Sequence, residues 1–122
     1  MGTAGAPEAR RGEEIPWQVM SRVEGLPLLG GAGEARLLLR GEASLTLQVR
    51  YPKGVSSPPH AHRHESHVYV LSGRVRGTLQ SETVELEAGD AVLHPAGVIH
   101  TVEALEDASW IEVKTPPEVV WS

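Results

Sequence analysis

The sequence predicts an all-β fold in a single domain, either a sandwich or a small barrel. Glycine and proline recur at short intervals from Ile15 onward, and the stretches between them are short, with period-2 or continuous apolar character. No long window keeps a helical repeat. About eight to ten short strands at regular spacing in 122 residues are typical of a sandwich or barrel.

The individual strands follow from local patterning. Residues 44–51 alternate, with Leu45, Leu47 and Val49 on one face, and residues 67–73 are mostly β-branched or aromatic. Residues 74–80 and 83–89 are short and form a hairpin. In order, the expected strands span 35–41, 44–51, 67–73, 74–80, 83–89, 90–95, 100–105 and 109–115.

The chain divides into a leader and one domain. Residues 1–13 are small, polar and charged, which predicts disorder, and residues 14–122 form the single domain. The chain has no Phe, so its interior must be aliphatic. Trp17, Trp110 and Trp121 are expected to pack in the core, although they could instead plug a barrel mouth or a dimer interface.

Composition excludes several classes of function. The formal net charge is -5 and no Lys/Arg stripe is present, so nucleic acid is not an expected partner. There is no cysteine, which excludes disulfides and thiolate metal sites. The N-terminal residues contain no apolar signal segment and no apolar run is long enough for a membrane span, so no membrane partner and a cytoplasmic location are expected.

Four of the six histidines lie between His60 and His67. In an extended segment, His60, His62, His64 and Ser66 point to one face, whereas Ala61, Arg63, Glu65 and His67 point to the other. A His-x-His pair on one face brings two imidazoles close enough to bind one metal ion. This stretch alone leaves two interpretations open, a metal site and a polar strand with a chance histidine cluster.

A second stretch, 89–100, favours the metal site. Pro95 and Gly97 predict a tight turn, after which His100 begins the next strand. If that strand folds back beside the first, His100 points into the same space as His60 and His62.

Together the two stretches resemble the two signature motifs of the cupins. Gly54, His60, His62 and Gly73 fall at positions of the first motif. The second motif is matched in order by Gly89, Pro95, Gly97 and His100. The resemblance covers a motif-bearing core of about residues 44–113. It implies a double-stranded β-helix, or jelly-roll barrel, with a metal in its mouth, and a homodimer.

The sequence departs from the cupin pattern at two positions. Ser66 stands where the glutamate ligand of the first motif is expected, and Ala104 stands where the second motif has asparagine. The favoured interpretation is that His60, His62 and His100 alone hold the metal and that Ser66 leaves an open coordination site. The alternatives add a fourth ligand, either His67 or His64.

Several further residues are candidates for the pocket, each with a structural alternative. His94 precedes Pro95 and could donate a proton or wall the pocket, although a surface position is favoured. Arg50 could clamp a substrate carboxylate or lie on a solvated face. Tyr69 is expected in the core or in the pocket wall. No catalytic residue is identified.

The resemblance implies a metal-binding monodomain cupin with a divalent transition metal, Fe, Mn, Zn or Ni, that acts on a small molecule. Similarity to three-histidine cupin dioxygenases, which also lack the glutamate, favours a non-haem iron dioxygenase. Two alternatives remain: a Lewis-acid isomerase, lyase or cyclase acting on a sugar acid or polyketide-like substrate, and a cupin that binds a small ligand without catalysis.

Overall fold

The structure, a computed structural model, describes residues 6–122 and confirms the all-β prediction. The only helical element in that range is a 3-10 turn at Gly12–Glu14. The strands are β1 (Gln18–Met20), β2 (Arg22–Val23), β3 (Leu26–Pro27), β4 (Gly33–Arg40), β5 (Leu45–Tyr51), β6 (Glu65–Ser72), β7 (Arg74–Leu79), β8 (Glu82–Glu87), β9 (Ala91–His94), β10 (His100–Ala104) and β11 (Ala108–Thr115).

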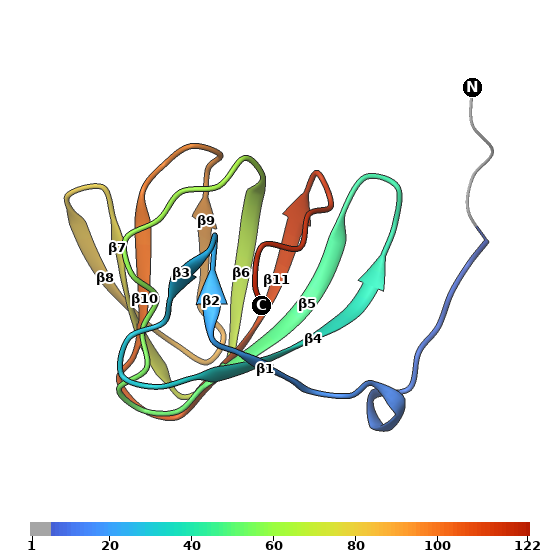
Figure 1. The fold of residues 1–122 in the computed structure, drawn as a ribbon, viewed down its shortest axis with the longest axis horizontal. Helices are drawn as coiled ribbons and strands as arrows, with labels where there is room; N and C mark the ends of the chain where they lie inside the picture. Colours follow the sequence, from blue (N-terminus) through green and yellow to red (C-terminus); the bar gives the residue numbers. More distant parts are fainter. Residues whose placement is uncertain (1–5) are drawn as a thin grey trace.

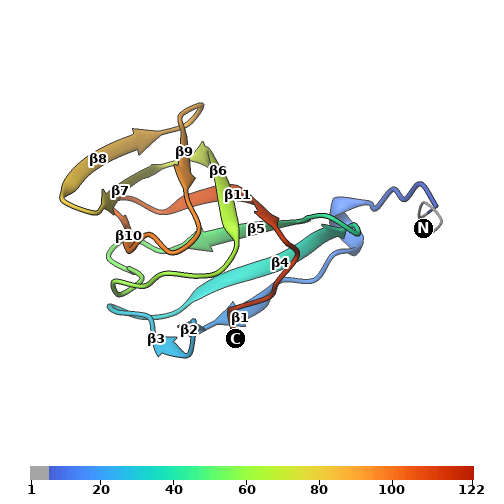
Figure 2. The same ribbon diagram turned by 90° about the horizontal axis from the view of Figure 1, so that it is seen from above.

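The strands form a large sheet, a smaller sheet and a two-stranded ribbon. The large sheet has the order β1-β4-β5-β11-β6-β9, and the smaller one has the order β10-β7-β8. The ribbon pairs β2 with β3. Figures 1 and 2 show these sheets curving around a common interior, with β7, β8 and β10 at one end and β4 at the other. The site described below lies in this interior, between the inner face of the large sheet and β10 of the smaller sheet.

The antiparallel register of the large sheet arranges inward-facing residues in rows. Trp110 on β11 is paired with Val49 on β5 and Val70 on β6, and all three are 1% exposed or less. This row is the centre of an aliphatic core, which continues through the apolar residues of β4, β5 and β6. The edge of Trp110 meets the Tyr51 ring at a centroid distance of 4.8 Å.

The segment that follows β11 returns to the beginning of the domain. The backbone of Val23 pairs with that of Trp121, and the Ser122 carbonyl accepts hydrogen bonds from the amides of Ser21 and Arg22 at 2.7 and 2.9 Å. Figure 2 shows this segment descending from β11 to the side of β1 and β2. It brings the Trp121 side chain over the inner face of the large sheet.

The structure differs from expectation at two places. Each of the eight expected strands has a counterpart, but the short strands β1 to β3 were not expected. The segment 60–64 is not a strand, because only His60 makes an isolated bridge there and β6 begins at Glu65. The backbone is therefore looped where an extended strand was expected.

The expected disordered leader falls partly outside the described residues, which begin at position 6. Residues 6–11 have no regular secondary structure, and the 3-10 turn follows. Within the described range, no helix has the length and apolar character needed to cross a membrane.

Candidate metal centre

Three histidines converge in the interior. His60, His62 and His100 each offer a ring nitrogen, and these atoms lie within 4.8 Å of one another. All three side chains are buried. His60 and His100 are neighbours because their backbones form an isolated bridge, with N–H···O distances of 3.2 and 2.9 Å.

The turn at Pro95–Val98 holds His62 in place. The Val98 amide donates to the Pro95 carbonyl, and Gly97 has a φ of 78°, which suits the third position of a type II turn. In that conformation the Gly97 amide donates to the His62 carbonyl at 2.9 Å. The turn therefore ties the first histidine stretch to the second.

Hydrogen bonds to backbone carbonyls orient each of the three rings. Nδ1 of His60 lies 2.8 Å from the Pro58 carbonyl oxygen. Nδ1 of His62 lies 3.1 Å from the backbone carbonyl oxygen of His64, and Nδ1 of His100 lies 3.1 Å from that of Val98. A carbonyl can only accept, so each Nδ1 carries the proton and each Nε2 keeps a free lone pair. This is the arrangement by which proteins prepare histidine as a metal ligand.

Burial keeps His62 and His100 neutral. It lowers the pKa of His62 and, together with the charge of His94, lowers the pKa of His100 to about 3. Neutral imidazole is the form that binds a metal ion, and it suits Fe, Mn, Zn and Ni alike. The donor set therefore fits a divalent transition metal without selecting one.

Two further histidines stack on the three. His94 lies parallel to His100 at a centroid distance of 3.8 Å, and His64 lies parallel to His62 at 3.7 Å. Burial lowers the pKa of His94 to about 4 and that of His64 to about 3. His94 is 3% exposed and lines the cavity, so the surface position favoured for it is wrong. Both ring nitrogens of the fully buried His64 have no hydrogen-bond partner among the described residues.

Ser66 lies in a polar row on the inner face of the large sheet. Its register partners are Lys114 on β11 and His94 on β9, and both of those side chains line the cavity. Cross-strand partners share one face of a sheet, so Ser66 faces the same interior. Its side chain is 1% exposed, and its hydroxyl has no hydrogen-bond partner among the described residues.

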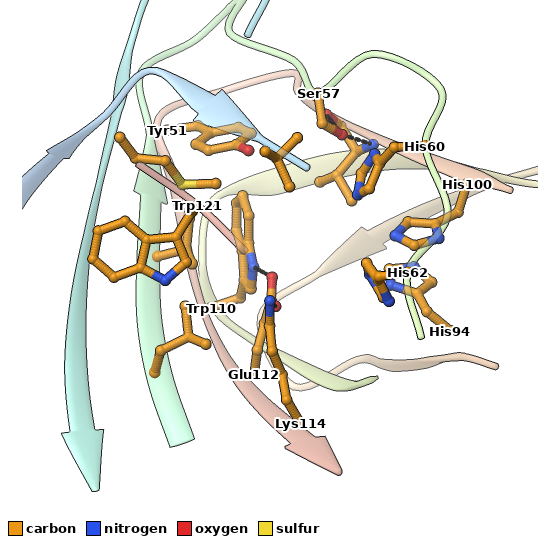
Figure 3. Close-up of a pocket in the computed structure, with 15 residues that line it drawn as sticks. Tyr51, Ser57, His60, His62, His94, His100, Trp110, Glu112, Lys114 and Trp121 are labelled. Carbon is orange, nitrogen blue, oxygen red and sulfur yellow. Dashed lines mark hydrogen bonds and ion pairs between the residues drawn. The ribbon is translucent and has the colours of Figure 1, made fainter. Parts of the chain in front are cut away.

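A buried carboxylate and ammonium lie beside the histidines. Glu112 Oε2 is 3.7 Å from Lys114 Nζ, and Glu112 Oε1 accepts a 2.8 Å hydrogen bond from Trp110 Nε1. Figure 3 shows this pair between the indole of Trp110 and the histidines. Burial raises the pKa of Glu112, but the Lys114 charge and the Trp110 hydrogen bond outweigh it, so the net pKa lies below the usual value.

The cavity enclosed by these groups is small. Its volume is about 30 Å³, enough for roughly two water molecules. Met20, Val23 and Trp121 contribute apolar walls from β1, β2 and the terminal segment. Figure 3 shows Trp121 across the cavity from the histidines. A ligand larger than the cavity can place only one small group beside the histidines.

Three candidate residues lie away from this cluster. His67 and Tyr69 are on the outer face of β6, with a 64% exposed His67 side chain paired to Glu65 at 3.3 Å. Arg50 is also exposed, bonded to Glu34 at 3.0 Å, and its guanidinium covers the Trp17 ring. None of the three lines the cavity, and the core or wall position expected for Tyr69 is not observed.

Sequence reasoning missed Glu112 and Lys114, and it named Trp121 only as a core residue or a plug of the barrel mouth. The first two alternate with Ile111 and Val113, and that pattern favours turning the apolar pair inward, whereas the structure turns the charged pair inward. The only available signal was the spacing of Trp110, Glu112 and Lys114, which places a tryptophan on the charged face.

Comparison with known proteins gives one family and several relatives. The family model of the cupin domain, Cupin_2, matches residues 47–114. The pectin degradation protein KdgF of Dickeya dadantii strain 3937 is 26% identical over 98 residues, which cover 80% of this chain and 81% of that protein.

Solved structures agree in fold. KdgF from Halomonas sp. superposes with a TM-score of 0.80 at 23% identity, covering 93% of this chain and 96% of that one. An RmlC-like cupin from Shewanella frigidimarina superposes with a TM-score of 0.76 at 22% identity, covering 91% of this chain and 92% of that one. A predicted oxalate decarboxylase from Thermotoga maritima superposes with a TM-score of 0.77 at 24% identity, covering 88% of this chain and 98% of that one. These likenesses confirm the jelly-roll barrel, and the family match over more than half of the sequence shows that the chain belongs to the cupin family, as a small cupin with three histidines placed so that they could hold a metal ion.

Proposed function

We propose that this cupin is a metal-dependent enzyme that moves a proton next to a carbonyl group of a small sugar acid, as an isomerase or lyase does. The observation that carries the proposal is a buried carboxylate, Glu112, in the same cavity as three histidines whose Nε2 lone pairs converge. A Lewis acid and a base in one small cavity are the two groups that such chemistry requires.

His60, His62 and His100 would hold the divalent metal. When bound, the metal would polarise a substrate carbonyl and so acidify the adjacent C–H bond. Because all three ligands are neutral, a divalent ion keeps its full charge, whereas a carboxylate ligand in place of Ser66 would lower that charge by one. The hydrogen bonds from Nδ1 to carbonyls keep the rings in place throughout.

Glu112 would be the group that accepts the proton. Its lowered pKa keeps it ionised at neutral pH, so it is available as a base. The Trp110 N–H holds one carboxylate oxygen at 2.8 Å, which fixes the orientation of the other. The apolar walls from Met20, Val23 and Trp121 limit access of water to the same space.

The substrate class rests on the relatives. A protein of pectin degradation is similar over 80% of this chain, and pectin is a polymer of uronic acids. The dioxygenase that the sequence favoured and the binding module that it left open both remain candidates. The absence of a carboxylate among the three histidines favours an iron dioxygenase as the second candidate, and a cupin that only binds its ligand is the third.

The test begins with metal analysis of protein purified without a histidine tag. About one equivalent is expected in the wild type and in the His67→Ala control, and it should be lost in His100→Ala. Anaerobic conversion of uronic acids, followed by NMR, supports the proposal. Oxygen consumption would identify the dioxygenase instead, and saturable binding without product would identify the binder. A wild type that cannot be loaded with metal would refute the proposal.

We also propose that the chain forms a homodimer through the outer face of β6, β9 and β11. Tyr69, Leu71 and Leu93 are 49%, 41% and 44% exposed there, and Ile111 and Val113 continue the apolar surface. Sedimentation of wild type and Tyr69→Lys tests this, because a charge at the centre of the face should yield monomers. A monomeric wild type would refute the dimer. A cytoplasmic location remains a prediction.

A further inference from the structure

The row formed by Lys114, Ser66 and His94 has a feature that the proposed chemistry does not use. Lys114 is 3% exposed, and its nearest charged partner is Glu112 at 3.7 Å, beyond ordinary hydrogen-bond distance. Its side chain lines the cavity, and the Glu112 carboxylate is its one ion-pair partner among residues 6–122. An ammonium has three N–H donors, and burying them without acceptors is costly.

The hydroxyl of the neighbouring Ser66 is also a buried donor. It is buried and lacks a hydrogen-bond partner within the described part of the chain. Ser66 and Lys114 are direct cross-strand partners, so their side chains rise from the same face of the sheet, roughly 5 Å apart at Cβ. Of the two, only Lys114 lines the cavity, so its ammonium is the donor that an oxyanion in the cavity can reach.

We infer that Lys114, with Ser66 beside it in the sheet, binds the carboxylate of the substrate next to the three histidines. The inference rests on the proposed function for the substrate class, and it assigns the end of the sugar acid that enters the cavity. The cavity of about 30 Å³ receives a group of carboxylate size but not a sugar ring. The ring therefore stays at the mouth, against Trp121 and Met20.

The charges of the cavity favour an anion. The negative charge of Glu112 is balanced by Lys114, whose ammonium lies 3.7 Å away. A bound divalent cation would add positive charge. A glutamate in place of Ser66 would cancel part of that positive charge. The lack of a carboxylate at position 66 therefore leaves the cavity more favourable to an anion.

Binding of matched sugars tests the inference. D-galacturonate and D-galactose differ at one carbon, which carries a carboxylate in the first and a hydroxymethyl group in the second. Calorimetric titration of metal-loaded wild type should show tighter binding of galacturonate. Lys114→Met should weaken the binding of galacturonate about tenfold or more, as expected for loss of a charge-assisted hydrogen bond. The affinity for galactose should stay unchanged. Ser66→Ala should give a smaller loss of the same kind.

Two controls keep the result interpretable. Lys53→Met removes the only other lysine, which is exposed in a turn, and should change neither affinity. Because Lys114→Met leaves Glu112 buried without its counter-charge, the double variant Lys114→Met/Glu112→Gln provides a neutral pair if the single variant does not fold. The double variant should show the same loss of preference for galacturonate.

The outcomes separate this inference from the proposed function. Equal weakening of both sugars in Lys114→Met, or no preference for galacturonate in the wild type, would overturn the carboxylate site even if the enzyme turns over. A clear preference that Lys114→Met abolishes supports the site even if no product forms. Metal content measured on every sample shows whether a loss of binding comes from loss of the metal.

Discussion

Acid should destabilise the metal-free protein steeply, well before its carboxylates titrate. His64, His94 and His100 are buried, and burial lowers their pKa values to about 3, 4 and 3, from 6.5 in an unfolded chain. Between these limits the unfolded chain binds protons that the folded chain does not. The stability is therefore present above pH 6.5 and is lost as the pH falls toward 4.

The magnitude follows from the same values. Lowering the pH from 7 to 5 should reduce the free energy of unfolding by about 1.8 kcal/mol for each of the three histidines, or about 5 kcal/mol together. Whole domains are stabilised by only ~5–15 kcal/mol, so the change is a large share of the total. Urea denaturation of chelator-treated protein at pH 7, 6 and 5 measures it.

Two variants make the result specific. His94→Gln should remove about a third of the pH dependence, whereas His67→Gln, which changes an exposed histidine, should leave it unaltered. A fall of less than ~2 kcal/mol between pH 7 and 5 in the metal-free wild type would refute the reasoning, because it would mean that the folded protein accepts these protons.

Three substitutions probe the packing around the site. Trp110→Ala should cost ~3–5 kcal/mol of unfolding free energy, because it empties the core centre and removes the hydrogen bond to Glu112. Gly73→Ala should cost at least ~1–3 kcal/mol, because φ is 73° and the new Cβ would collide with the Asp107 carbonyl. Arg74→Ala should cost under ~1 kcal/mol, since its ion pair is exposed. Urea denaturation at pH 7 ranks the three, and a reversed order would contradict these assignments.

The pattern of buried and exposed side chains in the histidine segment was predictable from the sequence. The looped conformation of its backbone was not. His60, His62, His64 and Ser66 are buried, while Arg63, Glu65 and His67 are exposed, as an alternating segment requires. The alternation persists in a loop because His60 is paired to His100 and His62 is tied to Gly97, so contacts outside the segment impose it. Those contacts join residues far apart in the sequence, and local patterning does not contain them.

The β11 strand shows the opposite case. Its apolar residues Ile111 and Val113 are on the outer face, and Glu112 and Lys114 are inside. Burying a charged pair is costly unless it is compensated, so the composition of a strand favours the reverse orientation. The orientation is set instead by Trp110, which fills the centre of the core. A site residue placed against the hydrophobic pattern cannot be found from that pattern.

The strands β1 to β3 escaped prediction because they are only two or three residues long. β2 is bonded to the terminal segment as well as to β3, through Val23 and Trp121. A two-residue strand has little intrinsic β-propensity, and its conformation depends on pairing partners that are distant in the sequence.

That pairing between Val23 and Trp121 sets an order of events during synthesis. Met20 and Val23 leave the ribosome almost a hundred residues before the tryptophan that covers them. All three cavity histidines emerge earlier than Trp121, so a nascent chain can expose a half-walled cavity with its imidazoles already present. Closure then requires a contact across nearly the whole sequence, which makes it a slow step. Metal capture by the nascent chain would thus precede completion of the apolar wall.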